Sequence, residues 1–149
     1  MRIYVATTVP RFKDCRIVQE VLRKSGHTIT HDWTKDIENI DDIKHTAESL
    51  QEAALQDVEG VRAANLLVVL LPAARGTHIE IGAAIALRKP VILATLPGAE
   101  DFKVSSDACC FYWYHSIIRI QTKDHSVFKM GHTIAQVIED SFLYSESRK

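Results

Sequence analysis

The hydrophobic and polar positions along the chain alternate between short apolar runs and longer segments with helical periodicity. The most apolar run is 66–71, with the sequence LLVVLL, and it is bounded by Asn65 and Pro72. A short, continuous apolar run of this kind is typical of a strand buried on both faces of a parallel sheet. By the same criteria, further strands are predicted at 2–6, 27–32, 91–94 and 117–120.

Segments with helical periodicity lie between these strands. The first, 14–26, has Asp14 as a capping residue and ends at Gly26. Its apolar stripe consists of Ile17, Val18, Val21 and Leu22. Further helices are predicted at 45–64, 77–88 and 127–143. The acidic stretch 33–43 is predicted to be irregular, and it is either a solvated loop or a mobile flap over a ligand.

Strands that alternate with helices in this way form a doubly wound parallel sheet. We expect an α/β, flavodoxin-like fold with five parallel strands in the order 2-1-3-4-5 and helices on both faces. Residues 1–149 are expected to form a single domain, with a frayed tail at 144–149. In this order the first and third strands are neighbours, so a ligand crevice opens between their carboxyl ends.

The composition is that of an ordinary globular domain. The chain has 149 residues, of which 46% are hydrophobic and 25% charged, and its formal net charge is -1. No basic excess indicates a nucleic acid polymer as partner, and no apolar run approaches the roughly 20 residues of a membrane span. Three cysteines without CxxC spacing, and no signal peptide, favour the reduced cytoplasm. Seven histidines without metal-ligand spacing predict no metal, and we expect no cofactor.

A carboxylate, Glu80, follows the central strand in the segment 76–82, GTHIEIG. Ligands of open α/β sheets bind at that edge, so Glu80 is a candidate nucleophile or base. The spacing of Thr77 and Glu80 is also that of a capping box, in which Glu80 would only satisfy the start of the helix. Asp57 interrupts an apolar helix stripe, and it either pairs with Arg62 or faces the same crevice as Glu80.

Several classes of protein that adopt this fold do not match the sequence. A response regulator needs an aspartate at the end of the third strand, where Leu70, Leu71 and Pro72 stand. A flavodoxin needs a glycine-containing phosphate loop after the first strand, and 6–13 has no glycine. No dinucleotide-binding G-x-G-x-x-G, Walker motif or G-x-S-x-G elbow occurs.

An ordered set of short segments provides a further clue. It consists of IY at 3–4, QDVEGV at 56–61 with ANLLVV at 64–69, and GTHIEIGAA at 76–84 with KPVI at 89–92. This set resembles the nucleoside 2-deoxyribosyltransferase family, including its relatives that hydrolyse deoxynucleoside 5′-phosphates. The resemblance extends from Arg2 to about Ile120.

The resemblance implies cleavage of the N-glycosidic bond of a 2′-deoxyribonucleoside or its 5′-phosphate, by deoxyribosyl transfer or hydrolysis. It implies that Glu80 attacks the sugar C1′, that Asp57 binds or protonates near the sugar and base, and that the Tyr4 hydroxyl holds Glu80. These residue types suit the reaction, because a carboxylate can trap an oxocarbenium ion and a departing base needs a proton.

One of the departures from the family pattern bears on the substrate. Ala74 stands where the transferases have an aspartate and the nucleotide hydrolases a phosphate-binding serine, so the need for a 5′-phosphate stays open. The arginines among the expected substrate contacts either bind that phosphate or are plain surface charge. The expected contacts are Thr7, Thr8, Arg11, Arg75, Gly76 and Thr77.

Rival functions and a prediction about assembly remain. The rivals are a non-catalytic nucleotide-binding or sensor module on the same fold and a glycosidase acting on ribonucleotides. The family builds its site with a neighbouring chain, and a monomer would expose the aromatic segment 109–115. The expected partners are therefore a small-molecule nucleoside or nucleotide and a second copy of the chain, in a homodimer or higher homo-oligomer.

Overall fold

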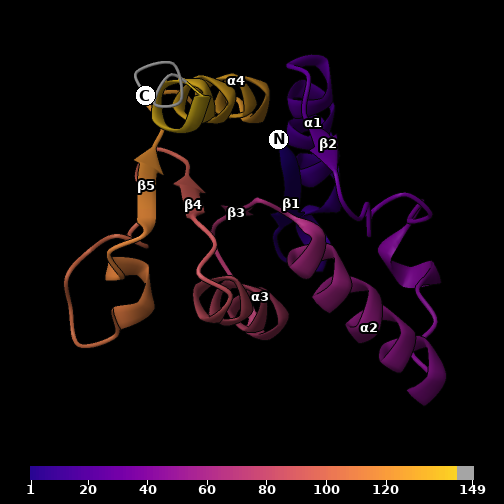
Figure 1. Ribbon diagram of the computed structural model, residues 1–149. Helices are drawn as coiled ribbons and strands as arrows, with labels where there is room; N and C mark the ends of the chain where they lie inside the picture. The colour runs from indigo at the N-terminus through magenta and orange to yellow at the C-terminus, as the bar shows by residue number, and fades with distance from the viewer. Residues whose placement is uncertain (144–149) are drawn as a thin grey trace.

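The computed structural model describes residues 1–143, and these contain a five-stranded parallel sheet (Figure 1). The strands are β1 (Arg2–Ala6), β2 (Thr28–Ile29), β3 (Leu66–Leu70), β4 (Val91–Thr95) and β5 (Ile117–Gln121). Their order is β2-β1-β3-β4-β5, and every neighbouring pair is parallel. The predicted flavodoxin-like α/β fold is therefore confirmed. The predicted frayed tail lies outside the described residues.

Helices cover both faces of the sheet. They are α1 (Phe12–Lys24), α2 (Ala47–Ala63), α3 (Arg75–Ala86) and α4 (Val127–Ile138). As Figure 1 shows, α1 and α4 pack together on one face, while α2 and α3 lie on the other. Short 3-10 turns occur at Val9–Arg11, Ile40–Asp42 and Cys110–Trp113, and a π-helical turn at Glu139–Leu143 follows α4.

Each face of the sheet has its own hydrophobic core, because successive side chains of a strand point in opposite directions. In β1, Ile3 and Val5 enter the core under α1 and α4, whereas Tyr4 and Ala6 enter the core under α2 and α3. β3 and β4 bury every side chain, which explains their unbroken apolar sequences. The alternation in β1 thus brings the hydroxyl-bearing ring of Tyr4 to the face that α2 and α3 cover.

The second strand is shorter than predicted, since 27–32 contains strand pairing only at Thr28–Ile29. The polar residues that follow use their side chains for other bonds. Thr30 Oγ1 donates to the Gly60 carbonyl at 2.7 Å, and Asp32 accepts from Thr34 Oγ1 at 2.7 Å. The edge strand therefore ends early.

The predicted starts of α1 and α2 are also wrong. α1 begins at Phe12 rather than at Asp14, because a 3-10 turn with Pro10 at its start already has helical geometry. Asp14 lies in the first turn and accepts from Arg11 Nε at 2.9 Å. α2 begins at Ala47 rather than at 45, because Thr46 and Ser49 form the capping box there.

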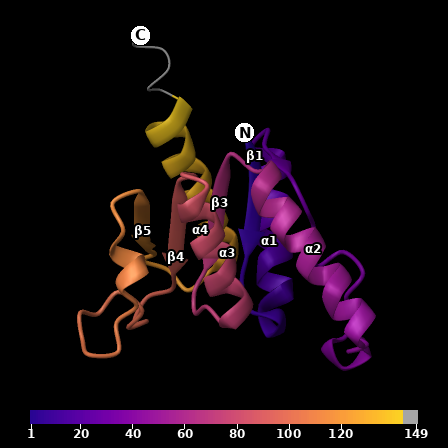
Figure 2. The ribbon, with the colours of Figure 1, turned by 60° about the horizontal axis from the view of Figure 1, so that its bottom comes forward.

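Much of α2 extends away from the sheet (Figure 2). Within the helix only Gly60 and Val61 are buried, whereas Leu50, Leu55 and Val58 are exposed. The predicted apolar stripe of this helix therefore contacts the core mainly through its last turn.

Candidate active site

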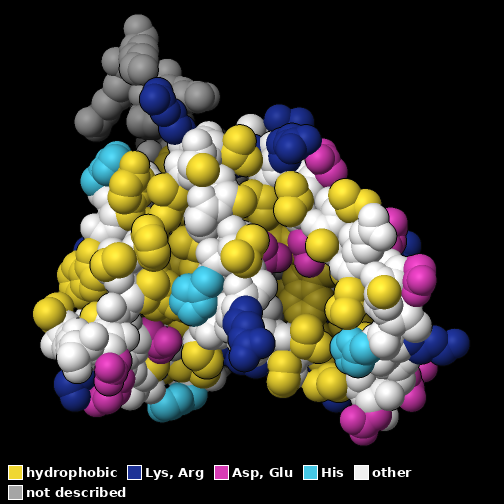
Figure 3. Space-filling view, turned by 90° about the horizontal axis from the view of Figure 1, so that it is seen from below, with side chains coloured by type: hydrophobic (Ala, Val, Ile, Leu, Met, Phe, Trp, Pro, Cys, Tyr) yellow, Lys and Arg dark blue, Asp and Glu magenta, His cyan; other side chains and the backbone are white. Residues whose placement is uncertain are grey.

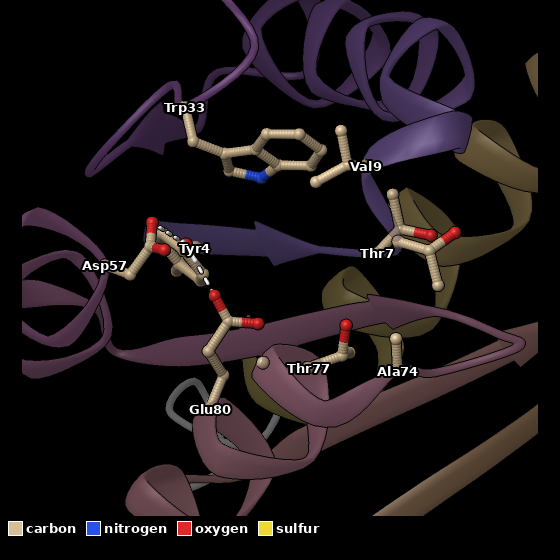
Figure 4. Close-up of a pocket in the computed structure, with 10 residues that line it drawn as sticks. Tyr4, Thr7, Val9, Trp33, Asp57, Ala74, Thr77 and Glu80 are labelled. Atoms are coloured by element: carbon tan, nitrogen blue, oxygen red, sulfur yellow. Dashed lines mark hydrogen bonds between the residues drawn. The ribbon is translucent and has the colours of Figure 1, made fainter. Parts of the chain in front are cut away.

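The Tyr4 hydroxyl connects the two candidate carboxylates. It lies 2.7 Å from Asp57 Oδ1 and 2.7 Å from Glu80 Oε1 (Figure 4). These side chains come from β1, α2 and α3, so three segments distant in sequence meet at one oxygen atom. The contact between Tyr4 and Asp57 is one that the sequence did not indicate.

A close helix approach at Gly60 makes this meeting possible. A Cβ atom at Gly60 would lie 2.8 Å from His31 Cβ and 2.8 Å from Tyr4 Cδ2, so only glycine fits without movement of its neighbours. Asp57 lies about one helical turn before Gly60, and the approach brings it to Tyr4. Arg62, the alternative partner of Asp57, instead bonds Glu59 at 2.7 Å.

Glu80 does not belong to a capping box. α3 begins at Arg75, its N-cap residue is Ala74, and no side chain caps it. Thr77 is therefore already inside the first turn, where it is buried, and the Glu80 carboxyl is directed to Tyr4 instead. The capping-box interpretation is wrong because the helix starts earlier than its sequence signal suggested.

Burial dominates the electrostatics of the site. It raises the pKa of the Glu80 carboxyl from 4.5 to about 7; the hydrogen bond from Tyr4 opposes this rise, and the charge of Asp57 adds to it. Burial, together with the charges of both carboxylates, also raises the pKa of the Tyr4 hydroxyl far above its usual value of 10.0. Tyr4 therefore stays protonated, and Glu80 titrates near the pH at which proton transfer is most useful.

A cavity of about 150 Å³ opens beside these side chains, between the loop after β1 and the loop after β3. In Figure 4, Glu80 and Thr77 lie on one side of it, and Trp33 and Val9 lie opposite. This is the edge of the sheet at which the crevice was predicted. The lining residues are Tyr4, Thr7, Thr8, Val9, Trp33, Asp57, Ala74, Gly76, Thr77 and Glu80.

Trp33 is a cavity residue that sequence reasoning missed, since it was assigned only to the acidic loop. Its indole Nε1 donates to the Val5 carbonyl at 3.0 Å, which fixes the ring plane. Arg16 of α1 donates to the Thr34 and Ile37 carbonyls, so the start of the stretch 33–43 is tied to the domain. The available signal was a tryptophan at the carboxyl end of a predicted strand.

His31 was missed as well. Its Nε2 lies 3.7 Å from Asp57 Oδ1, and its ring is nearly parallel to that of Tyr4, with the centroids 6.3 Å apart. The imidazole therefore lies against both the Asp57 carboxylate and the Tyr4 ring.

The two arginines predicted as substrate contacts do not line the cavity. Arg11 donates from Nε to Asp14 at 2.9 Å and from Nη1 to the Leu71 carbonyl. Its Nη2 is buried and finds no partner within residues 1–143. Arg75 is exposed at the start of α3.

The space-filling view shows acidic side chains beside a hollow with hydrophobic walls, and a broader hydrophobic area on the left of the same face (Figure 3). In the described part of the chain no group of three or more His, Cys, Asp or Glu could hold a metal ion. Nor does any helix there have the length and apolar character to cross a membrane.

Solved structures share this fold. CMP N-glycosidase BcmB from Clostridium botulinum is 16% identical with a TM-score of 0.60, over 93% of this chain and 99% of the other. BlsM is 17% identical with a TM-score of 0.59, over 93% and 91%. A 2-deoxyribosyltransferase from Bacillus psychrosaccharolyticus is 24% identical with a TM-score of 0.52, over 64% and 72%. No protein-family model matches the chain, and no curated protein matches it by sequence.

Proposed function

We propose that the protein cleaves the N-glycosidic bond of a 2′-deoxyribonucleoside or its 5′-phosphate, by deoxyribosyl transfer or hydrolysis. The observation that carries this proposal is the pair of carboxylates, Asp57 and Glu80, on the Tyr4 hydroxyl at the wall of a cavity. We propose further that residues 1–149 act as one catalytic domain.

In the proposed reaction, ionised Glu80 attacks the sugar C1′ as the bond to the base breaks. Its negative charge stabilises the oxocarbenium-like transition state and then forms a glycosyl ester. Asp57 supplies a proton to the departing base, which is a poor leaving group as an anion. Water, or the nitrogen of a second base, then attacks C1′ and releases Glu80.

The proposed substrate contacts follow from the lining of the cavity. Thr7, Thr8, Gly76 and Thr77 lie beside the start of α3, where free backbone N–H groups favour an anionic group. A 5′-phosphate would be bound there with help from Arg11 and Arg75, since Ala74 has no hydrogen-bond donor in its side chain. The buried, unpartnered Nη2 of Arg11 supports a role for this arginine.

The comparisons support the class of reaction. A CMP N-glycosidase and a 2-deoxyribosyltransferase share the fold, and the first of them matches 93% of this chain. The CMP N-glycosidase favours a second candidate substrate, a ribonucleotide, because CMP is one. We rank the 2′-deoxy sugar first, since a 2′-oxygen destabilises the oxocarbenium ion and would lie against Glu80.

The decisive experiment is incubation with a panel of nucleosides, deoxynucleosides and their 5′-monophosphates, followed by chromatography of the free base. We expect cleavage by the wild type, with a higher kcat/KM for deoxy than for ribo substrates. Glu80→Gln should fold and lose nearly all turnover, because the amide cannot neutralise the developing charge. Glu59→Gln is the matched control, since Glu59 is 62% exposed and bonds only Arg62 among the described residues. Full activity of Glu80→Gln would contradict the role of Glu80.

We also propose that the protein is cytoplasmic and forms a homodimer or higher homo-oligomer. Phe111, Trp113 and Tyr114 are 59%, 44% and 39% exposed, and Leu50 and Leu55 of α2 are each 57% exposed. These side chains lie at two separate places, one before β5 and one on α2, and exposed apolar clusters of this kind mark interaction sites. Light scattering at micromolar protein concentration should give at least twice the mass of one chain, and a monomer would contradict the proposal.

A further inference from the structure

The Tyr4 hydroxyl has a carboxyl oxygen 2.7 Å away on each of two sides. A hydroxyl carries one hydrogen to donate and accepts through its lone pairs, whereas an ionised carboxylate only accepts. Two ionised carboxylates therefore cannot both be hydrogen-bonded to Tyr4. One of the two contacts requires a protonated carboxyl that donates to the Tyr4 oxygen.

The surroundings indicate that Glu80 carries this additional proton. The Asp57 side chain is 34% exposed, and His31 Nε2 lies 3.7 Å from it. In the described residues, no other basic side chain lies within 4.0 Å of either carboxyl group. Burial raises the pKa of Glu80 to about 7. The resting arrangement is thus Glu80 O–H donating to Tyr4 Oη, and Tyr4 O–H donating to Asp57 Oδ1.

We propose that this shared proton is the one the leaving base receives, and that it travels from Glu80 through Tyr4 to Asp57. This inference rests on the proposed N-glycosidic cleavage and deepens it. Asp57 takes the Tyr4 hydrogen, and Tyr4 Oη takes the hydrogen of Glu80. The concerted shift of these two hydrogens therefore ionises Glu80, the nucleophile, and protonates Asp57, the acid.

The proton balance closes over the whole reaction. Glu80 forms its ester with C1′, the electron pair of the C–N bond goes to the base, and Asp57 protonates that base. In the second half, Asp57 takes a proton from the attacking water or from the acceptor base. The ester bond breaks, its electron pair returns to Glu80, and the proton returns from Asp57 through Tyr4. The site ends in the state in which it began.

The resting proton can be tested without any substrate. We expect that ¹³C NMR of the labelled carboxyl groups will find one carboxyl that titrates near pH 7 in the wild type and is missing in Glu80→Gln. Ionisation of both Glu80 and Asp57 at pH 6 would overturn the proposal, because the shared proton would not exist.

A test of the proton route needs a second substrate whose leaving group requires no proton, such as 4-nitrophenolate. We expect Tyr4→Phe to lower kcat for the natural substrate by about 100-fold or more, the size of a general-acid contribution. At pH 8, above its pKa of about 7, Glu80 can lose its proton to solvent, so the same variant should change kcat for 4-nitrophenyl 2-deoxyriboside little, whereas Glu80→Gln should lose both reactions. Tyr112→Phe is the matched control, since Tyr112 is 5% exposed and its hydroxyl contacts His78 Nε2 at 3.1 Å, outside the site.

The outcomes separate the two levels of the proposal. Equal losses of Tyr4→Phe on both substrates would mean that Tyr4 only positions Glu80, and would overturn the proton route while leaving N-glycosidic cleavage intact. A wild type that cleaves neither substrate would overturn the proposed function and the route together, while the carboxyl titration still reports the resting proton.

Discussion

Replacement of Glu80 by glutamine should stabilise the protein at alkaline pH while abolishing turnover. The folded protein binds the Glu80 proton more tightly than the unfolded chain, because burial raises this pKa from 4.5 to about 7. Below pH 4.5 the carboxyl is protonated in both states, so ionisation costs nothing. As the pH rises from 4.5 to about 7, the unfolded chain releases its proton first. The free energy of unfolding therefore falls until the pH passes the folded pKa.

The size of the effect follows from the pKa difference. A rise from 4.5 to about 7, at about 1.36 kcal/mol per pH unit, corresponds to about 3 kcal/mol of stability lost between acidic and alkaline pH. Glutamine has no charge to bury, and its amide N–H donates to the Tyr4 oxygen as the protonated carboxyl does. The variant should therefore match the wild type near pH 4.5 and exceed it by about 3 kcal/mol near pH 8.

Urea unfolding followed by circular dichroism at both pH values measures this difference directly. About 3 kcal/mol corresponds to a rise of roughly 6–12 °C in Tm for a chain of this size. The difference between variant and wild type cancels the contributions of other titrating groups. Parallel stability curves for the two proteins across this pH range would refute the reasoning, since they would mean that Glu80 titrates normally when folded.

The remaining predictions concern Gly60 and Trp33. Gly60→Ala should destabilise the fold by about 1–3 kcal/mol and lower activity, because the new Cβ would overlap His31 and Tyr4. Gly82→Ala is the control: its Cβ would have open space within 4 Å, so it should be neutral or slightly stabilising. An unchanged free energy of unfolding for Gly60→Ala, measured in urea, would contradict the close approach. Trp33→Leu should raise KM by roughly 5- to 100-fold with a smaller effect on kcat, since an aromatic stacking contact with a base contributes about 1–3 kcal/mol; an unchanged KM would remove Trp33 from substrate binding.

The sheet could be predicted from the sequence because parallel central strands need continuous apolar residues. The run at 66–71 is too short for a helix and is followed by Pro72, so a buried strand was favoured, and β3 buries all of its side chains. The edge strand was overestimated because its polar residues look equally suitable for a strand, while Thr30 and Asp32 bond to atoms of other segments. Local pattern does not contain those partners.

The site was predictable only in part, for the same reason. Glu80 and Asp57 were candidates from the sequence pattern, and the family resemblance added Tyr4 and the three roles. Their meeting at one hydroxyl depends on the approach of α2 at Gly60. Trp33 and His31 follow an edge strand whose end could not be located, so their direction was undetermined. Arg11 was expected to face a ligand, but its hydrogen bonds to Asp14 and Leu71 could not be read from the sequence.

The part of α2 before Gly60, which extends away from the sheet, should differ from the rest of the fold in amide hydrogen exchange. In a single chain, the helix before Gly60 has no buried side chain, and isolated helices shorter than about 12–15 residues are marginally stable in water. These amides should therefore exchange through local opening, far faster than those of β3. Asp57 lies where this weakly held part meets the anchored turn. Any partner that covers Leu50 and Leu55 would slow the exchange and hold Asp57 against Tyr4, so the specific activity should fall when the protein is diluted below the concentration at which that partner dissociates.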